Sequence, residues 1–107
     1  MIFRRERFGD LVRRQLDLFE TDEAELLGEA AQADMAWTKA AADETEDLYG
    51  DYQLVVDAVG ERLYDVREAY ATTLEDDAAA EYRRSFDRAA LKRFKNLASF
   101  LQAGEDE

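Results

Sequence analysis

Carboxylates at helical spacing are the residues of this sequence with the clearest potential for chemistry. Glu25 and Glu29 are four residues apart, and Glu44 and Asp47 are three apart, so each pair would share one face of a helix. Carboxylate oxygens are the ligands that Mg²⁺, Mn²⁺ and Ca²⁺ prefer. These four residues are therefore a candidate site for Mg²⁺, and the chain must fold as helices to assemble it.

This spacing resembles part of the pattern of the all-helical MazG-like nucleotide pyrophosphohydrolases. That family places Glu-Glu-x-x-Glu on one helix and Glu-x-x-Asp on the next, and these carboxylates hold Mg²⁺ over the phosphates of a nucleotide. Residues 44–47 match the second element, whereas the interval in residues 25–29 departs from the first. The resemblance implies a Mg²⁺-dependent nucleotide pyrophosphohydrolase as one alternative. Solvated carboxylates are the other interpretation, because 26 of the 107 residues are acidic.

The composition excludes several other kinds of site. The chain has no Cys and no His, which removes thiolate and imidazole ligands, cysteine nucleophiles and Ser–His pairs. Ser85 and Ser99 are its two serines, and neither follows a Gly-rich turn of the kind that exposes a nucleophile. We therefore expect no catalytic residue, and in the leading interpretation no cofactor.

The net charge of −12 argues against binding to nucleic acid through bulk charge. Residues 1–14 carry a net charge of +3, residues 15–82 carry −17 and residues 83–107 carry +2, so the basic ends should lie against the acidic middle. An acidic middle that docks on the basic surface of a partner is a second alternative function. The acidity, with 3 Lys against 11 Arg, also resembles that of proteins from salt-loving organisms, in which case the charge reflects the solvent.

Apolar residues recur at intervals of three and four along nearly the whole chain, which predicts an all-α fold. The spacing predicts helices over residues 3–19, about 22–40, 43–74 and 76–101, with Thr21 capping the second and Asp76 or Asp77 capping the fourth. One uninterrupted helix over residues 43–101 is the alternative, because neither Gly nor Pro marks the turn at residues 74–77. We expect one helical domain over residues 1–103 and a disordered acidic tail over 104–107.

A heptad register over the third predicted helix indicates how the molecule is shaped and what it does. A helix of this length spans about 46 Å, so we expect an elongated bundle: a long antiparallel hairpin of the last two helices, with two shorter helices along it. The apolar stripe is wider than one partner helix would cover, which favours a self-associating, non-enzymatic interaction module. The predicted homodimer interface consists of Tyr49, Tyr52, Val56, Val59, Leu63 and Val66.

The sequence also bears on location. Charged residues interrupt every apolar run near the N-terminus, and no window approaches the roughly 18 apolar residues that a membrane span needs. We expect a cytoplasmic protein with no membrane partner.

Overall fold

The computed structural model describes residues 7–95, which form four helices. These are α1 (Gly9–Asp22), α2 (Ala24–Thr38), α3 (Thr45–Ala71) and α4 (Asp76–Arg93). Helix accounts for 83% of this part of the chain, and no strand occurs in it, which confirms the all-α prediction. None of these helices combines the length and the apolar character needed to cross a bilayer.

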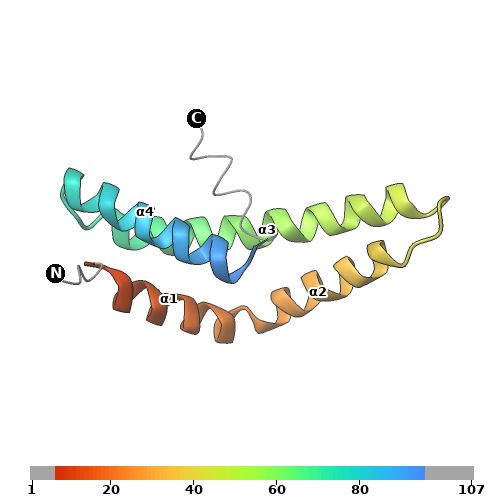
Figure 1. Ribbon diagram of the computed structural model, residues 1–107, viewed down its shortest axis with the longest axis horizontal. Helices are drawn as coiled ribbons and strands as arrows, with labels where there is room; N and C mark the ends of the chain where they lie inside the picture. Colours follow the sequence, from red (N-terminus) through yellow and green to blue (C-terminus); the bar gives the residue numbers. More distant parts are fainter. Residues whose placement is uncertain (1–6, 96–107) are drawn as a thin grey trace, which may run out of the picture.

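The molecule is elongated, measuring 54 × 29 × 27 Å, with α1 and α2 end to end along the hairpin of α3 and α4 (Figure 1). α4 has 18 residues and α3 has 27, so α4 runs beside only the C-terminal part of α3. We call the part where α1, α3 and α4 pack together the three-helix end. We call α2 with residues 45–58 of α3 the two-helix end, because only two helices meet there.

The core lies mainly in the three-helix end. Leu16 of α1, Leu63 of α3 and Phe86 of α4 have no exposed surface, and burying each such side chain stabilises the fold by about 1.5–3 kcal/mol. The Tyr82 ring is equally buried, and its hydroxyl donates a hydrogen bond to Oε1 of Gln15 at 2.7 Å. The apolar stripes of all three helices therefore meet in one cluster.

A network of charged side chains joins α3 to α4. Nη1 of Arg67 donates to both carboxylate oxygens of Asp87, at 2.7 and 2.8 Å, and the Asp87 side chain is only 3% exposed. Arg83 of α4 donates two hydrogen bonds to Glu68 of α3, at 2.9 and 2.8 Å. These bonds, with a further one from Arg67, hold the pKa of Glu68 below its usual value. The two helices are thus fixed in register by charge-assisted hydrogen bonds.

The boundaries of the first two helices correct the sequence prediction. α1 begins at Gly9, because Arg7 and Phe8 form a turn that lays the Phe8 ring edge-on to Tyr82 at 5.5 Å. Residues 3–6 of the predicted first helix lie outside the described residues. α1 also continues past Phe19 to Asp22, so Thr21 lies inside it and does not cap α2. The Thr21 hydroxyl donates instead to the carbonyl of Asp17, at 3.4 Å.

The last two helices are also shorter than predicted. α3 begins at Thr45 and ends at Ala71, where the Thr73 hydroxyl donates to the carbonyl of Tyr70 at 2.7 Å and stabilises a turn. The turn separates α3 from α4, so the alternative of one uninterrupted helix is wrong. α4 begins at Asp76 as predicted, but its N-cap is Glu75, without a side-chain bond.

α4 ends at Arg93 because Phe94 leaves the helix with φ −124° and ψ 59° and packs edge-on to Phe19 at 5.7 Å. The remainder of the predicted fourth helix, residues 96–101, and the predicted tail, residues 104–107, lie outside the described residues.

The Tyr82 phenol should ionise above the ordinary range of tyrosine. Burial raises the pKa of Tyr82 to about 12, and it also raises the pKa of Tyr52. Because the folded-state pKa of Tyr82 exceeds the value of about 10 in an unfolded chain, the buried neutral phenol of Tyr82 contributes its full stability below pH 10. That contribution is lost as pH rises through 12. Ultraviolet titration should show a late step that Tyr82→Phe removes and that Tyr64→Phe leaves in place. Ionisation of Tyr82 near pH 10 would contradict its burial.

Candidate functional site

The four predicted metal ligands lie as two separate, exposed pairs. Glu25 and Glu29 are on α2, whereas Glu44 and Asp47 flank the start of α3 beyond the loop. Glu29 precedes the end of α2 by nine residues, which separates the pairs by about 14 Å along the helix axis. Within residues 7–95, no three carboxylates gather in a geometry that could hold a metal ion.

The six predicted interface residues divide between the core and the surface. Val56, Val59 and Leu63 are at most 3% exposed and pack inside the single chain. Val66 and Tyr52 are half-buried, and Tyr49 is 45% exposed. A contact with another molecule therefore cannot use the centre of the predicted seam without unfolding the chain, and it must use the surface around the seam.

An aromatic cluster closes the far end of the α2–α3 pair. The indole of Trp37 stacks on the Tyr52 ring, with centroids 5.6 Å apart and planes 11° apart. Tyr49 approaches the same indole, with centroids at 5.2 Å. Since Trp37 is the single tryptophan of the chain, its fluorescence reports on the two-helix end alone.

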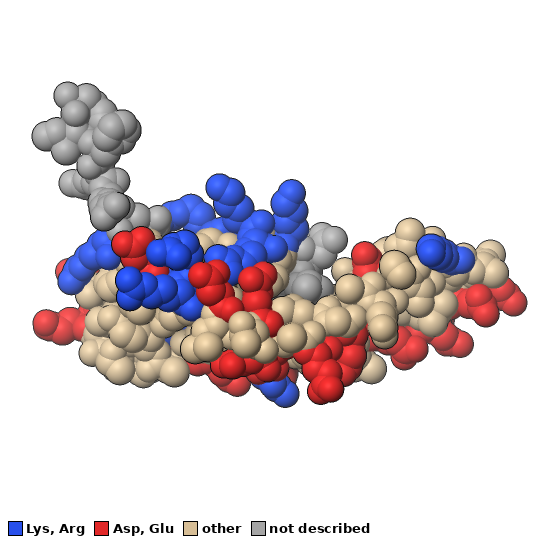
Figure 2. Space-filling view, turned by 90° about the horizontal axis from the view of Figure 1, so that it is seen from below, with Lys and Arg blue, Asp and Glu red and all other residues tan. Residues whose placement is uncertain are grey.

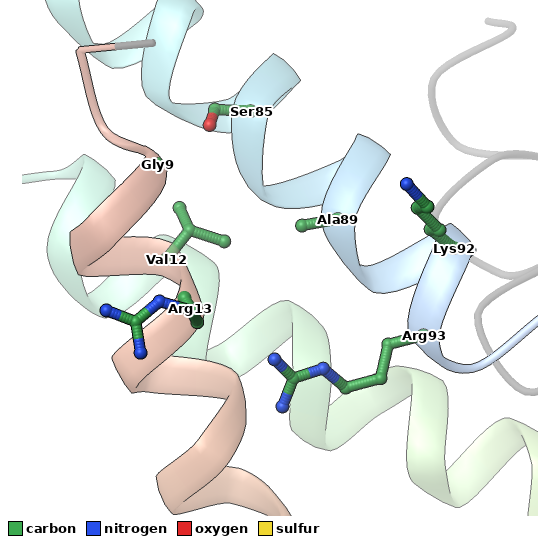
Figure 3. Close-up of a pocket in the computed structure, with 7 residues that line it drawn as sticks. All are labelled: Gly9, Val12, Arg13, Ser85, Ala89, Lys92 and Arg93. Atoms are coloured by element: carbon green, nitrogen blue, oxygen red, sulfur yellow. The ribbon is translucent and has the colours of Figure 1, made fainter. Parts of the chain in front are cut away.

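A hollow of about 410 Å³ lies between α1 and α4 in the three-helix end. Gly9, Val12, Ser85 and Ala89 line it, and Figure 3 shows Arg13 and Arg93 below them and Lys92 to the right of Ala89. Ser85 precedes Lys92 by seven residues, or about 10 Å along the helix, which is too far for Lys92 to activate its hydroxyl.

The arginines of this hollow are already occupied. Nη1 of Arg93 lies 2.8 Å from a carboxylate oxygen of Asp17 and 3.4 Å from one of Glu20. Arg13 lies within 3.8 Å of Asp10 and Asp17. These carboxylates offset much of the positive charge, so the hollow offers neither a nucleophile nor a strong anion site.

A second hollow of about 360 Å³ lies where α4 ends, against the two-helix end. We call it the open groove. Leu27, Ala30 and Ala31 of α2 and Tyr52 of α3 give it apolar walls, and Asp34 adds one carboxylate. The remaining wall consists of the last residues of α4 and the two that follow, which are Lys92, Arg93, Phe94 and Lys95.

The open groove exists because α4 ends at Arg93, whereas α3 continues beyond that level. Arg67, Gly60, Gln53 and Glu46 follow one another at seven-residue steps, so they lie close to one face of α3. Arg67 binds α4 and Gly60 is buried, whereas Gln53 and Glu46 are exposed. About 20 Å of this face, from residue 45 to residue 58, thus lies beyond the end of α4.

Charge is distributed unevenly along the molecule. Residues 24–58 contain nine acidic side chains and one basic side chain, Lys39. Figure 2 shows Lys and Arg gathered over the three-helix end at left and acidic side chains predominating towards the two-helix end at right. The open groove lies at the boundary between these two regions.

Two features of the sequence are related to the open groove, but neither identifies it without the structure. The stripe of α2 is rich in Ala, which indicates that something packs closely against it, but it does not indicate on how many sides. The cluster of Lys92, Arg93 and Lys95 is equally consistent with a solvated helix face. Comparison of the chain with models of protein families, with characterised proteins and with solved structures finds no match.

Proposed function

We propose that the protein is a cytoplasmic, non-enzymatic helical interaction module that forms a homodimer through the open groove. The observation that carries this proposal is the position beside α3, beyond the end of α4, that no residue of the range 7–95 covers; we call it the vacant position. Ala31 and Gln53 are exposed at this position, although they flank residues that are buried, such as Ala30 and Val56. The walls of the open groove are apolar, and a pair of helices gains stability when another helix covers apolar surface of this kind.

A second copy of the chain fits this position better than an unrelated helix, because it has the same deficiency. Two copies related by a two-fold axis each cover the open side of the other, and two α2–α3 pairs together supply the four helices of a bundle. The half-buried rings of Trp37 and Tyr52 lie beside the contact. Tyrosine and tryptophan are enriched at such interfaces because their rings bury much area at little entropic cost.

The nucleotide hydrolase is a weaker candidate, because its four carboxylates lie as two pairs at separate places in the two-helix end. The docking of the acidic end on a basic surface remains compatible with the dimer, since a second copy can supply that surface.

Sedimentation equilibrium at tens of micromolar protein and 1 M salt tests the proposed homodimer. We expect a dimer, and a monomeric wild-type chain would contradict the proposal.

Ala31→Glu should weaken the dimer at least tenfold while leaving the monomer folded. Ala31 is exposed in the single chain and lines the open groove, so a glutamate there would lose its hydration on docking. Ala36→Glu is the matched control, because Ala36 is an exposed alanine of the same helix that does not line the groove.

Both substitutions introduce the same charge and cost only a few tenths of a kcal/mol in helix propensity. Sedimentation equilibrium gives the dissociation constants, and circular dichroism verifies that both variants fold. Equal dissociation constants for the two variants would place the contact elsewhere.

A further inference from the structure

Opposite charges lie on the two sides of the open groove along the length of α3. At one end lie Lys92 and Lys95, which are three residues apart and exposed. Neither lysine forms an ion pair with another residue of the range 7–95, whereas Arg93 is bound to Asp17 and Glu20. At the other end the chain turns from α2 into α3 through exposed carboxylates, which we call the acidic tip: Asp43, Glu44, Glu46 and Asp47.

The helix register locates the two charged ends relative to each other. Asp87 binds Arg67, and α3 and α4 are antiparallel, so Phe94, seven residues after Asp87, is level with Gly60, seven residues before Arg67. Glu46 lies fourteen residues further along α3, or about 21 Å from that level. The midpoint between the basic end and the acidic tip is Gln53, which is adjacent to Tyr52 in the open groove.

We infer, resting on the proposed homodimer, that the two copies pair antiparallel about a two-fold axis near Gln53, so that the acidic tip of each copy meets Lys92 and Lys95 of the other. An axis at the midpoint brings Glu46 of one copy level with the end of α4 in its partner. A parallel arrangement would instead place the two acidic tips together and the lysines of the two copies together. Electrostatic complementarity of this kind fixes orientation more strongly than it raises affinity.

Charge exchange between the two ends tests this orientation. One variant carries Lys92→Glu and Lys95→Glu, and the other carries Asp43→Lys and Glu46→Lys. In an antiparallel dimer the first variant turns two symmetric sets of attractive contacts into repulsive ones. The second variant brings the net charge of each acidic tip to zero and so removes the same attraction. An exposed pair changes affinity by up to about fivefold. We expect the dissociation constant of each variant at 0.05 M salt to exceed that of the wild type at least tenfold.

Mixing the two variants is the decisive step. In the mixed dimer one contact is that of the wild type and the other pairs the introduced glutamates with the introduced lysines, so we expect a 1:1 heterodimer that is tighter than either variant alone, observed by sedimentation and by the fluorescence of Trp37. A variant with Arg14→Glu and Arg84→Glu is the control, because it changes the net charge equally at two exposed residues that do not line the groove. It should dimerise like the wild type.

The outcomes separate the orientation from the dimer itself. If the wild type is dimeric but mixing fails to restore affinity, the antiparallel orientation is wrong and the dimer stands. If the control weakens the dimer as much as the exchanged variants, general repulsion and not a specific contact is responsible, which also overturns the orientation. A monomeric wild type overturns both.

Discussion

Asp87→Ala should lower the free energy of unfolding by about 3–5 kcal/mol, the largest loss expected from any surface-charge or ion-pair substitution in the described chain. The guanidinium of Arg67, whose side chain is 12% exposed, would lose the carboxylate that accepts two of its hydrogen bonds. Breaking a buried pair on one side leaves a charge that is only partly compensated, here by Glu68, and this costs far more than the net contribution of the pair. Urea denaturation followed by circular dichroism measures the change.

Removing both partners should cost much less than removing one. Arg67→Met combined with Asp87→Leu leaves no buried charge, and such replacements of buried ion pairs are often neutral or stabilising. Asp10→Ala provides the surface comparison, because Asp10 and Arg13 are 3.7 Å apart and largely exposed, and it should cost at most about 1 kcal/mol. An Asp87→Ala variant as stable as Asp10→Ala would show that Arg67 regains solvent when its partner is lost.

Much of the fold could be predicted because helical periodicity is a local property of the sequence. Residues three and four apart in α1, such as Val12, Leu16 and Phe19, are those that the structure buries. The start of α4 at Asp76 was also predicted, because the preceding threonines disfavour helix and the aspartates favour a first turn. These signals act within a few residues, so they can be read without knowing what packs against them.

The remaining features depend on contacts between residues far apart in the sequence. The end of α4 is set by Phe94, which packs on Phe19 of another helix. Asp87 is only 2% exposed, although nothing around it in the sequence distinguishes it from the exposed aspartates. Its burial follows from Arg67, twenty residues away, and periodicity does not encode that pairing.

Only part of the open groove can be predicted from the sequence, because it too depends on contacts between residues far apart in the chain. The heptad pattern identified the apolar face of α3 correctly, but a pattern on one helix does not say whether that face is covered by the same chain or by another. Val56 and Val59 are covered by the same chain, and the vacant position lies beside them, around Ala31 and Gln53. Similarly, the spacing predicts that Glu25 lies near Glu29 and that Glu44 lies near Asp47. It does not predict whether two pairs on different helices lie close together.

Leu63→Asp distinguishes a core from an interface at the centre of the α3 seam. Leu63 has no exposed surface in the single chain, so an aspartate there would be desolvated without a partner and would create a packing defect. The loss should exceed 4 kcal/mol, which is a large part of the 5–15 kcal/mol that stabilises a typical domain. We expect the variant to lose most of its helical circular dichroism at 25 °C.

Leu54→Asp is the matched control, because the same substitution on the same helix occurs at a side chain that is 70% exposed. It should change the free energy of unfolding by less than about 1 kcal/mol and should leave the dimer intact, since Leu54 lies on the face of α3 away from its buried residues. A Leu63→Asp chain that remains folded but becomes monomeric would place Leu63 at the dimer contact. That result would require the two copies to exchange helices, because only an exchange could expose Leu63 to a second copy and still keep it buried.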